Sequence, residues 1–445
     1  ISYRQSPAGQ KHFGMSPYDA ESFWFRPYLD DEVCWTGTNN GVWDEYQQRQ
    51  YPSFDGWNSI SEQTMADDNP DNDLTPSGVK KLFTWEHRLN GAIRSPDVNI
   101  DAGFGGPVPF ISSRFGNLRF FLSTLHEQDM YLYEVSSPGL YRQSYLLKLT
   151  SDLTVNSKLV YSFYNGNMEG TTLSRGGGTS IMNDVWDLAS QVNSSGFTMP
   201  WRLYTNEYWA PTEVKNSTHG LKYTRFINND AFFDLLLKID SKDYITGHGA
   251  RRDTIKTYPI FGSEDDLWTA DEAPVGFFGG PLFSVEGRLA FGGAISTSRD
   301  SSRVRTVTFK GNYTRQLNKN HQLKTGGELV LSKLDLKYGS QNEFLPSGNY
   351  WSLMDVNPYR LSFFVQDKLE YRGFVAIAGL NLDVLNPNGE WYVIDLYDDD
   401  FFSSNYTAAA EETFETISLD PQVQLSPRLA LSHPITETSK LYFNY

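Results

Sequence analysis

The chain has few of the residues on which disulfide, metal-cluster or helical membrane proteins depend. Cys34 is the only cysteine among 445 residues, which excludes an intrachain disulfide and a thiolate metal cluster. No run approaches the roughly 18 charge-free apolar residues that a membrane-spanning helix requires, and the mean hydropathy is −0.47. Basic residues are also scarce, with 38 Lys and Arg against 54 Asp and Glu, so nucleic acid is not expected as a partner.

Catalytic motifs are missing as well. The sequence contains no nucleophile elbow, P-loop, dinucleotide-binding glycine fingerprint or HExxH motif. The glycine-rich run from Arg175 to Ser180 has no strand-helix context, so a flexible loop is the better interpretation. The seven histidines are scattered without metal-ligand spacing. We therefore expect no catalytic residues and no enzymatic activity.

The chain does contain long runs of alternating apolar and polar residues. The clearest spans Pro358 to Val384, with a turn at Arg372-Gly373 and with Asp367 as the only break among its apolar positions. Its apolar positions are Tyr359, Leu361, Phe363, Val365, Leu369 and Tyr371, followed by Phe374, Ala376, Ala378, Leu380, Leu382 and Val384. A period of two predicts strands with one apolar face, and each run reaches the roughly 9–11 residues of a tilted membrane-spanning strand. Aromatic residues at both ends fit interfacial girdles, so the stretch predicts a transmembrane β-hairpin.

Similar runs recur through residues 97–445, and their connections alternate between short and long. Counting them gives about thirteen strands. Residues 6–94 are rich in aromatics without a sustained period and are expected to form a long extracellular loop that contains short helices, for instance over Ser77 to Leu89. The prediction is an all-β fold: residues 1–445 form one region of an antiparallel transmembrane β-barrel, with short periplasmic turns and long extracellular loops.

The odd strand number predicts that this region is only part of a larger barrel, because bacterial single-chain barrels have even numbers of strands. The chain starts at Ile1 without methionine or a signal peptide. A fragment truncated at both ends is therefore expected.

Several segments carry a family resemblance. These are GFGGPVPF (Gly103 to Phe110), HQLKTGGEL (His321 to Leu329), LSFFVQDKLEY (Leu361 to Tyr371), GLNLDV (Gly379 to Val384) and LSPRLALSHPIT (Leu425 to Thr436). Together they resemble TonB-dependent outer-membrane receptors of the type with an N-terminal carboxypeptidase-regulatory-like domain. The resemblance covers roughly residues 97–445 and implies about 22 strands in a complete receptor. It also implies a plug domain and a TonB box, for which this chain has no matching segment.

The resemblance implies active import of a scarce nutrient (a siderophore, cobalamin, glycan or peptide) across the bacterial outer membrane. The partners it implies are outer-membrane lipid, the TonB complex reached through the plug, and a small nutrient ligand, with this chain supplying barrel wall and ligand-capturing loops. A non-transport surface barrel or adhesin-like scaffold is the alternative. A soluble all-β carbohydrate-active enzyme would explain the aromatics and acids, but not the long strands with all long loops at one end.

One acidic segment has the spacing of a calcium loop. Asp67, Asn69, Asp71 and Asp73 follow a D-x-N-x-D-x-D pattern that can wrap oxygen ligands around Ca²⁺. Asn72 stands where an EF-hand has glycine, and no glutamate occupies the twelfth position, so an Asx-rich turn is the competing interpretation. Calcium is the one cofactor the sequence suggests; the acidic run Asp398 to Asp400 is expected to be a solvated loop.

Two further sets of side chains have positions that the pattern predicts. Arg360, Gln366, Lys368 and Glu370 are expected to face the lumen, and Asp367 to lie on the lipid-facing side at an interfacial or bulged point. The tryptophans of the irregular segments could stack on sugar rings or aromatic ligands. The simpler interpretation is that they pack the segments together or lie near the lipid head groups. These residues are Trp24, Trp35, Trp43, Trp57, Trp201 and Trp209.

Overall fold

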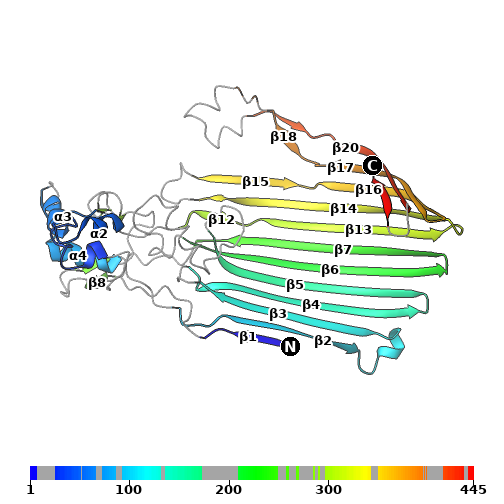
Figure 1. Ribbon diagram of the computed structural model, residues 1–445, viewed down its shortest axis with the longest axis horizontal. Coiled ribbons are helices and arrows are strands. Elements are labelled where there is room, and N and C mark those ends of the chain that lie inside the picture. The colour runs from blue at the N-terminus through cyan, green and yellow to red at the C-terminus, as the bar shows by residue number, and fades with distance from the viewer. Residues whose placement is uncertain are drawn as a thin grey trace.

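A computed structural model gives the structure of the protein. It describes residues 1–7, 26–51, 53–66, 73–86, 93–131, 136–172, 209–248, 257–259, 267–269, 284–285, 289–290, 296–341, 349–393, 395, 397, 414–434 and 439–444. Most of these residues belong to a single antiparallel sheet, and a group of helices lies beyond one end of it (Figure 1).

The sheet contains fifteen strand segments joined in sequence order. They are β1 (Ser2–Gln5), β2 (Val98–Pro107), β3 (Arg119–Met130), β4 (Gly139–Thr154), β5 (Ser157–Thr172), β6 (Ala210–Asn228), β7 (Ala231–Thr246), β12 (Ser298–Asp300), β13 (Arg303–Gln316), β14 (His321–Ser340), β15 (Tyr350–Val356), β16 (Tyr359–Tyr371), β17 (Phe374–Asn386), β20 (Gln422–Pro434) and β21 (Lys440–Asn444). Long alternating runs form these strands because every second side chain points to the same face.

Two pairs of segments are single strands with a local interruption. β12 and β13 keep one register against β14, and so do β15 and β16. The second break falls at Pro358, which has no N–H to donate to the ladder. Counted this way, thirteen strands cross the described sheet, which confirms the number expected from the alternation.

Short turns join the strands at one end of the sheet and long segments join them at the other (Figure 1). The shortest turns are residues 155–156, 229–230, 317–320 and 372–373. Arg372 and Gly373 have φ angles of 49° and 86°, the conformation of a two-residue turn whose twist matches the flanking strands. The three longest intervals between strands of the sheet, residues 173–209, 247–297 and 387–421, each begin and end at strand termini on the opposite side. The predicted alternation of loop lengths is confirmed.

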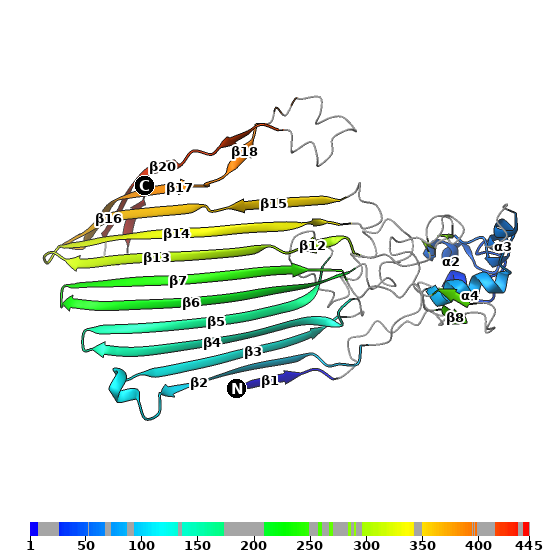
Figure 2. The ribbon, with the colours of Figure 1, turned by 180° about the vertical axis from the view of Figure 1, so that it is seen from behind.

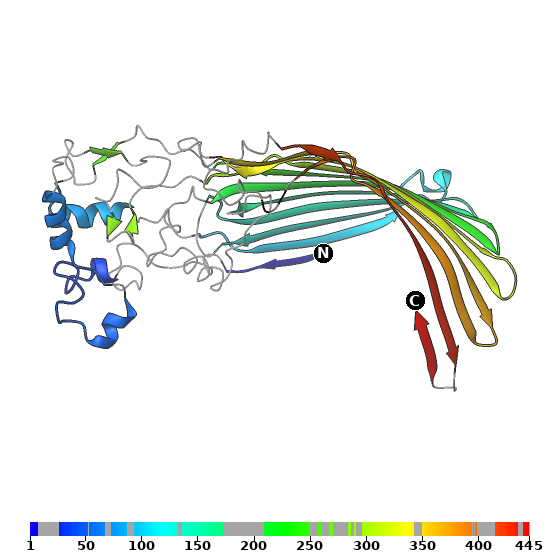
Figure 3. The same ribbon diagram turned by 90° about the horizontal axis from the view of Figure 1, so that it is seen from above.

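The sheet is curved and open. Figure 3 shows β20 and β21 turned away from the plane of the first strands. Among the described residues, β1 pairs only with β2 and β21 only with β20. The fold is therefore all-β, an antiparallel wall of the β-barrel class. Three small ladders lie outside the wall: β8 (Thr257–Pro259) with β9 (Leu267–Thr269), β10 (Ser284–Val285) with β11 (Leu289–Ala290), and β18 (Glu390–Tyr392) with β19 (Thr416–Ser418).

Four helices between β1 and β2 form what we call the helical unit. They are α1 (Arg26–Leu29), α2 (Glu45–Gln50), α3 (Trp57–Met65) and α4 (Pro76–Glu86). The unit lies beyond the long-loop end of the sheet (Figures 1 and 2). The sequence pattern predicted short helices in this stretch and located one of them near α4, so the positions of α1 to α3 are findings of the structure. No helix in the described part of the chain is long and apolar enough to cross a membrane.

Local sequence explains where these helices start. Asp44 accepts a hydrogen bond from the backbone N–H of Gln47 at 2.8 Å, and the Gln47 side-chain oxygen accepts one from the backbone N–H of Asp44, which caps α2. Gly56 precedes α3 with a φ of 92°, and a Cβ there would lie 2.5 Å from the Trp35 carbonyl oxygen. Only glycine fits that close approach.

Candidate functional site

The strand register aligns the apolar positions of neighbouring strands into a continuous band on one face of the sheet, the apolar face. One row of direct cross-strand neighbours is Leu221, Leu237, Phe309, Leu329, Leu361, Val384 and Val423. Phe309 is 49% exposed and Phe363, in the next row, is 51% exposed. A contiguous apolar surface of this extent is unusual for a water-soluble monomer and marks contact with lipid or another apolar partner.

The height of this band can be read along β13. Arg305 and Arg315 lie on the apolar face at its two edges, and Val307, Phe309, Gly311 and Tyr313 lie between them. The ten steps from Arg305 to Arg315 cover about 34 Å of strand at about 3.4 Å per residue. With a tilt of about 40° this corresponds to about 26 Å, close to the roughly 25 Å band of outer-membrane barrels.

The opposite side of the sheet, the polar face, carries cross-strand ion pairs. Glu328 on β14 contacts Lys310 on β13 at 3.1 Å and also contacts Arg360 on β16. Similar pairs join Arg142 to Glu127 at 3.0 Å and Lys222 to Asp234 at 3.3 Å. These side chains are partly exposed, so each pair contributes little stability by itself. The ion pairs show that the polar face is suited to contact with water.

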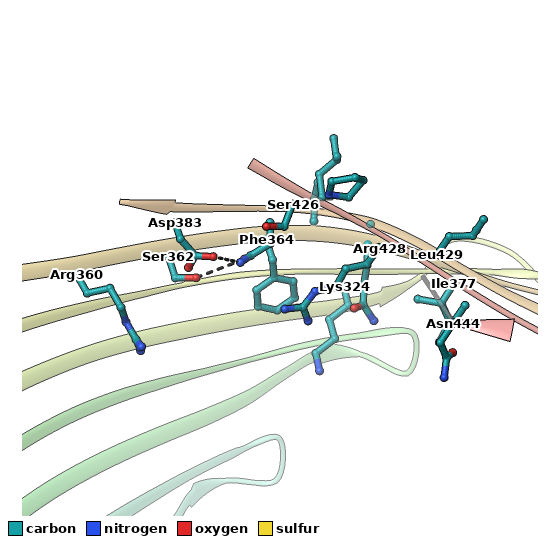
Figure 4. Close-up of a pocket in the computed structure, with 17 residues that line it drawn as sticks. Lys324, Arg360, Ser362, Phe364, Ile377, Asp383, Ser426, Arg428, Leu429 and Asn444 are labelled. Carbon is teal, nitrogen blue, oxygen red and sulfur yellow. Dashed lines mark hydrogen bonds between the residues drawn. The ribbon is translucent and has the colours of Figure 1, made fainter. Parts of the chain in front are cut away.

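The residues predicted to face the lumen lie on the polar face. Arg360 and Gln366 line a hollow of about 870 Å³ formed by β14, β16, β17 and β20. Figure 4 shows Lys324, Phe364 and Arg428 directed into the same space. Lys368 pairs with Glu370 on the same strand. The hollow combines cationic side chains, the Asp383 carboxylate and amide groups with an aromatic ring, so its lining is charged and polar.

Asp367 is the one acid within the apolar stripe of β16. The ladders on both sides of β16 pass through Asp367 without a register shift, which excludes the bulge that was one of two expected alternatives. Its carboxylate oxygen Oδ2 lies 2.6 Å from Nδ1 of His321. Asp367 shares a cross-strand row with Arg315, at the short-turn edge of the band, as the interfacial alternative requires.

The helical unit has a core of its own. Tyr28, Phe54, Trp57 and Phe83 are almost completely buried, and neighbouring rings lie about 5 Å apart. The indole N–H of Trp57 donates to the Tyr28 carbonyl at 2.7 Å. This packing stabilises the unit through burial and ring-ring contacts.

The structure tests four of the six tryptophans proposed as either sugar platforms or packing residues. Trp43, Trp57 and Trp209 are buried, so packing is confirmed for them. Trp35 is half-buried beneath the Lys80 ammonium, 4.6 Å from the ring centroid. Trp24 and Trp201 lie outside the described residues.

Cys34 is a packed thiol, as expected. It is completely buried, and its Sγ lies 3.4 Å from Nζ of Lys80, which also pairs with Asp31 at 2.9 Å. Burial raises the pKa of the Cys34 thiol, although the nearby Lys80 charge opposes that shift. Hydrogen bonding and the charge of Lys80 lower the pKa of Asp31.

The structure does not test the predicted calcium loop, which stays a prediction. Asp67, Asn69 and Asp71 lie outside the described residues, as do the glycine-rich run at 175–180 and the acidic run at 398–400. Asp73 is described and exposed, three residues before α4. Within the described ranges, no three His, Cys, Asp or Glu side chains come together as a metal site.

Comparison with known proteins gives structural similarities only. No protein-family model matches the chain, and no curated protein matches it. The FrpB iron transporter of Neisseria meningitidis is similar over 78% of this chain and 44% of its own, at 13% identity and a TM-score of 0.45. The ferric yersiniabactin uptake receptor FyuA of Yersinia pestis is similar over 78% of this chain and 44% of its own, at 9% identity and a TM-score of 0.47. The alcaligin outer-membrane receptor FauA of Bordetella pertussis is similar over 78% of this chain and 40% of its own, at 11% identity and a TM-score of 0.44. The chain spans less than half the length of each.

Proposed function

We propose that this chain forms part of the wall of an outer-membrane, TonB-dependent importer. The observation that carries the proposal is the inverted polarity of the sheet. One face exposes an apolar band about as tall as the apolar band of outer-membrane barrels, while the other face carries cross-strand ion pairs. All the long connections stand at one end, where an importer needs surface to capture a ligand. Most of the residues quoted for the family resemblance belong to strands of this wall, namely β2, β14, β16, β17 and β20.

In this proposal the polar face lines an aqueous interior and the apolar face contacts lipid of the bacterial outer membrane. The helical unit and the long segments stand outside the cell and capture the nutrient. The whole protein would also hold a plug within the barrel, and the TonB complex would act through that plug. We also propose the N-terminal carboxypeptidase-regulatory-like domain implied by the resemblance. No catalytic step is involved.

Growth under nutrient limitation tests this function. Cells lacking the gene are supplied with one limiting source at a time from a panel of ferric siderophores, cobalamin, oligosaccharides and peptides. The proposal expects growth on at least one source to fail both in the deletion strain and in a strain lacking TonB, with rescue by the gene in trans. Normal growth of the deletion strain on every source would contradict the import function.

A second candidate function is a non-transport surface scaffold. The observation that favours it is the helical unit, which has its own buried core and is presented at the long-loop end. A scaffold would bind its polymer or partner without energy. Ligand capture by whole cells that persists in the strain lacking TonB, with no accumulation inside the cell, would support this candidate over import.

A further inference from the structure

We propose that the two-stranded ladder of β18 (Glu390–Tyr392) and β19 (Thr416–Ser418) binds a basic peptide in an extended conformation. We call this ladder the aromatic ribbon. The inference rests on the proposed function in one respect, which is that the long-loop end of the sheet stands outside the cell. It goes further by assigning a ligand class to a particular surface at that end.

The aromatic ribbon lies beyond the apolar band. Asn386, the last residue of β17, shares a cross-strand row with Val307, the last apolar residue of β13 before the band ends at Arg305. The ribbon begins only after residues 387–389, and Figure 1 shows β18 beyond the end of β17 on the long-loop side of the sheet. Contact with the hydrocarbon region therefore does not account for its apolar side chains.

These apolar side chains are well exposed. Trp391 and Ile417 are direct cross-strand neighbours, and they are 54% and 53% exposed. The ring of Tyr392 has its centroid 6.2 Å from that of Trp391 and 6.1 Å from that of Phe414. Trp57 in the helical unit, by contrast, is fully buried among other rings. Exposed tryptophan and tyrosine rings are the side chains on which binding energy most often concentrates, and their faces attract cations.

The charge around the ribbon has one sign. Residues 373–427 contain no lysine, arginine or histidine. The described acids there that lie on or beside the ribbon are all exposed and have no ion pair in the described part of the chain; they are Glu390, Asp395, Glu415 and Asp420. On the wall, an acid such as Glu328 is compensated by neighbouring cations. A ligand that covers the ribbon must therefore supply positive charge.

The same charges argue against two other occupants. A second copy of the ribbon would bring like charges together, which is unfavourable. Anionic lipid head groups would be repelled in the same way. A cationic partner is the one whose charge complements this surface.

The backbone of the ribbon favours a peptide over a small cation. Among the described residues, β18 pairs only with β19, so each strand of the ribbon has an edge without a partner strand there. Such an edge offers alternating N–H and C=O groups to an extended chain. A polyamine would satisfy the acids alone. A basic peptide with apolar side chains can use the acids, the rings and the strand edge together.

Calorimetric titration of the purified whole protein in a neutral detergent tests the inference. The probes are a peptide of alternating lysine and valine, an analogue with glutamate in place of lysine, an analogue with serine in place of valine, and spermine. We expect the lysine-valine peptide to bind most tightly and its affinity to fall as salt is added. The lysine-serine peptide and spermine should bind more weakly, and the glutamate-valine peptide should not bind.

Variants of the ribbon separate the contribution of the rings from that of the charges. Trp391→Ala should weaken binding of the lysine-valine peptide about tenfold or more, and Trp391→Phe should retain most of it. The Glu415→Gln, Asp420→Asn double variant should weaken binding about tenfold and reduce its dependence on salt. Neither of these two side chains has a hydrogen bond in the described part of the chain, so the ladder should be preserved.

The matched controls lie in the helical unit at the same end of the molecule. Tyr46→Ala removes an exposed ring, and the Asp55→Asn, Glu62→Gln double variant removes two exposed acids. Both should leave peptide binding unchanged. Equal losses in these controls, no loss in Trp391→Ala, or binding of spermine or the glutamate-valine peptide as tight as that of the lysine-valine peptide would overturn the inference. Import is tested separately by the growth assay, so a protein that binds the peptide but supports no growth would contradict only the proposed function.

Discussion

The helical unit and the sheet place their apolar side chains in opposite ways. In the helical unit, Phe54, Trp57 and Phe83 are fully buried against one another. In the sheet, Phe309 and Phe363 have about half their surface exposed, and the ion pairs lie on the other face. Apolar side chains are thus hidden inside one region and displayed on the surface of the other. The difference fits the proposed placement, in which water surrounds the helical unit and lipid covers one face of the sheet.

The largest expected effect is on the core of the helical unit. Phe83→Ala should destabilise the unit by about 3–5 kcal/mol, because it removes a buried ring that contacts Tyr28 and Trp57. Alkylation of the buried Cys34 during a denaturant titration reports unfolding of this unit alone, and the strand signal in circular dichroism reports the sheet. Met65→Ala, at an exposed position of α3, is the control. Simultaneous loss of the strand signal would show that the two regions are not separate.

A charge on the apolar face should have the next largest effect. Leu361→Arg near the middle of the band should cost about 2–4 kcal/mol of folding free energy in a bilayer. Ser362→Arg, one residue away on the polar face, should be tolerated because its side chain points into the hydrated hollow. The measurement is a denaturant titration of protein folded into lipid vesicles. Equal damage from both variants would contradict the assignment of the two faces.

A smaller effect concerns pH and again separates the regions. Burial raises the pKa of Cys34, so the folded unit keeps the proton that the unfolded thiol loses above about pH 8.5. The contribution of Cys34 to the stability of the helical unit is therefore fully present below that pH, and it is lost as the pH rises through the folded pKa. Denaturant midpoints at pH 7 and pH 9.5 should differ in the wild type, and the difference should shrink in Cys34→Ala. An unchanged difference would show that another group causes it.

Calcium is expected to have the smallest effect, confined to the segment that leads into α4. If Asp67, Asn69, Asp71 and Asp73 bind Ca²⁺, Asp71→Ala should abolish the heat of binding in calorimetry. Asp400→Ala, in the acidic run expected to be a solvated loop, is the control. No difference in heat between the wild type and Asp71→Ala would leave an Asx-rich turn.

Alternation made the sheet predictable from the sequence. A strand buries or exposes every second residue, so the faces of β16 and β17 and the turn at Arg372-Gly373 follow from local pattern. Arg360, Gln366, Lys368 and Glu370 were placed on the polar face for the same reason. The contact of Glu328 with both Lys310 and Arg360 was not predictable, because it depends on the register between strands.

The helical unit escaped prediction for a different reason. Helices α1, α2 and α3 have four, six and nine residues, too few for a clear 3.6-residue period. Their core joins Tyr28, Phe54 and Phe83, which are far apart in the sequence and follow no repeat. The high aromatic content was visible, but which rings pack together was not. The capping box at Asp44 and Gln47 was the one local signal that could have located α2.

Nitroxide scanning along β16 in a lipid bilayer tests the inverted polarity most directly. Single cysteines replace residues 360–366 in a Cys34→Ser background, and each spin label is exposed to oxygen and to a water-soluble nickel chelate. We expect high oxygen and low nickel accessibility at Leu361, Phe363 and Val365, and the reverse at Ser362, Phe364 and Gln366. Accessibility without a two-residue period, or with the faces exchanged, would contradict it.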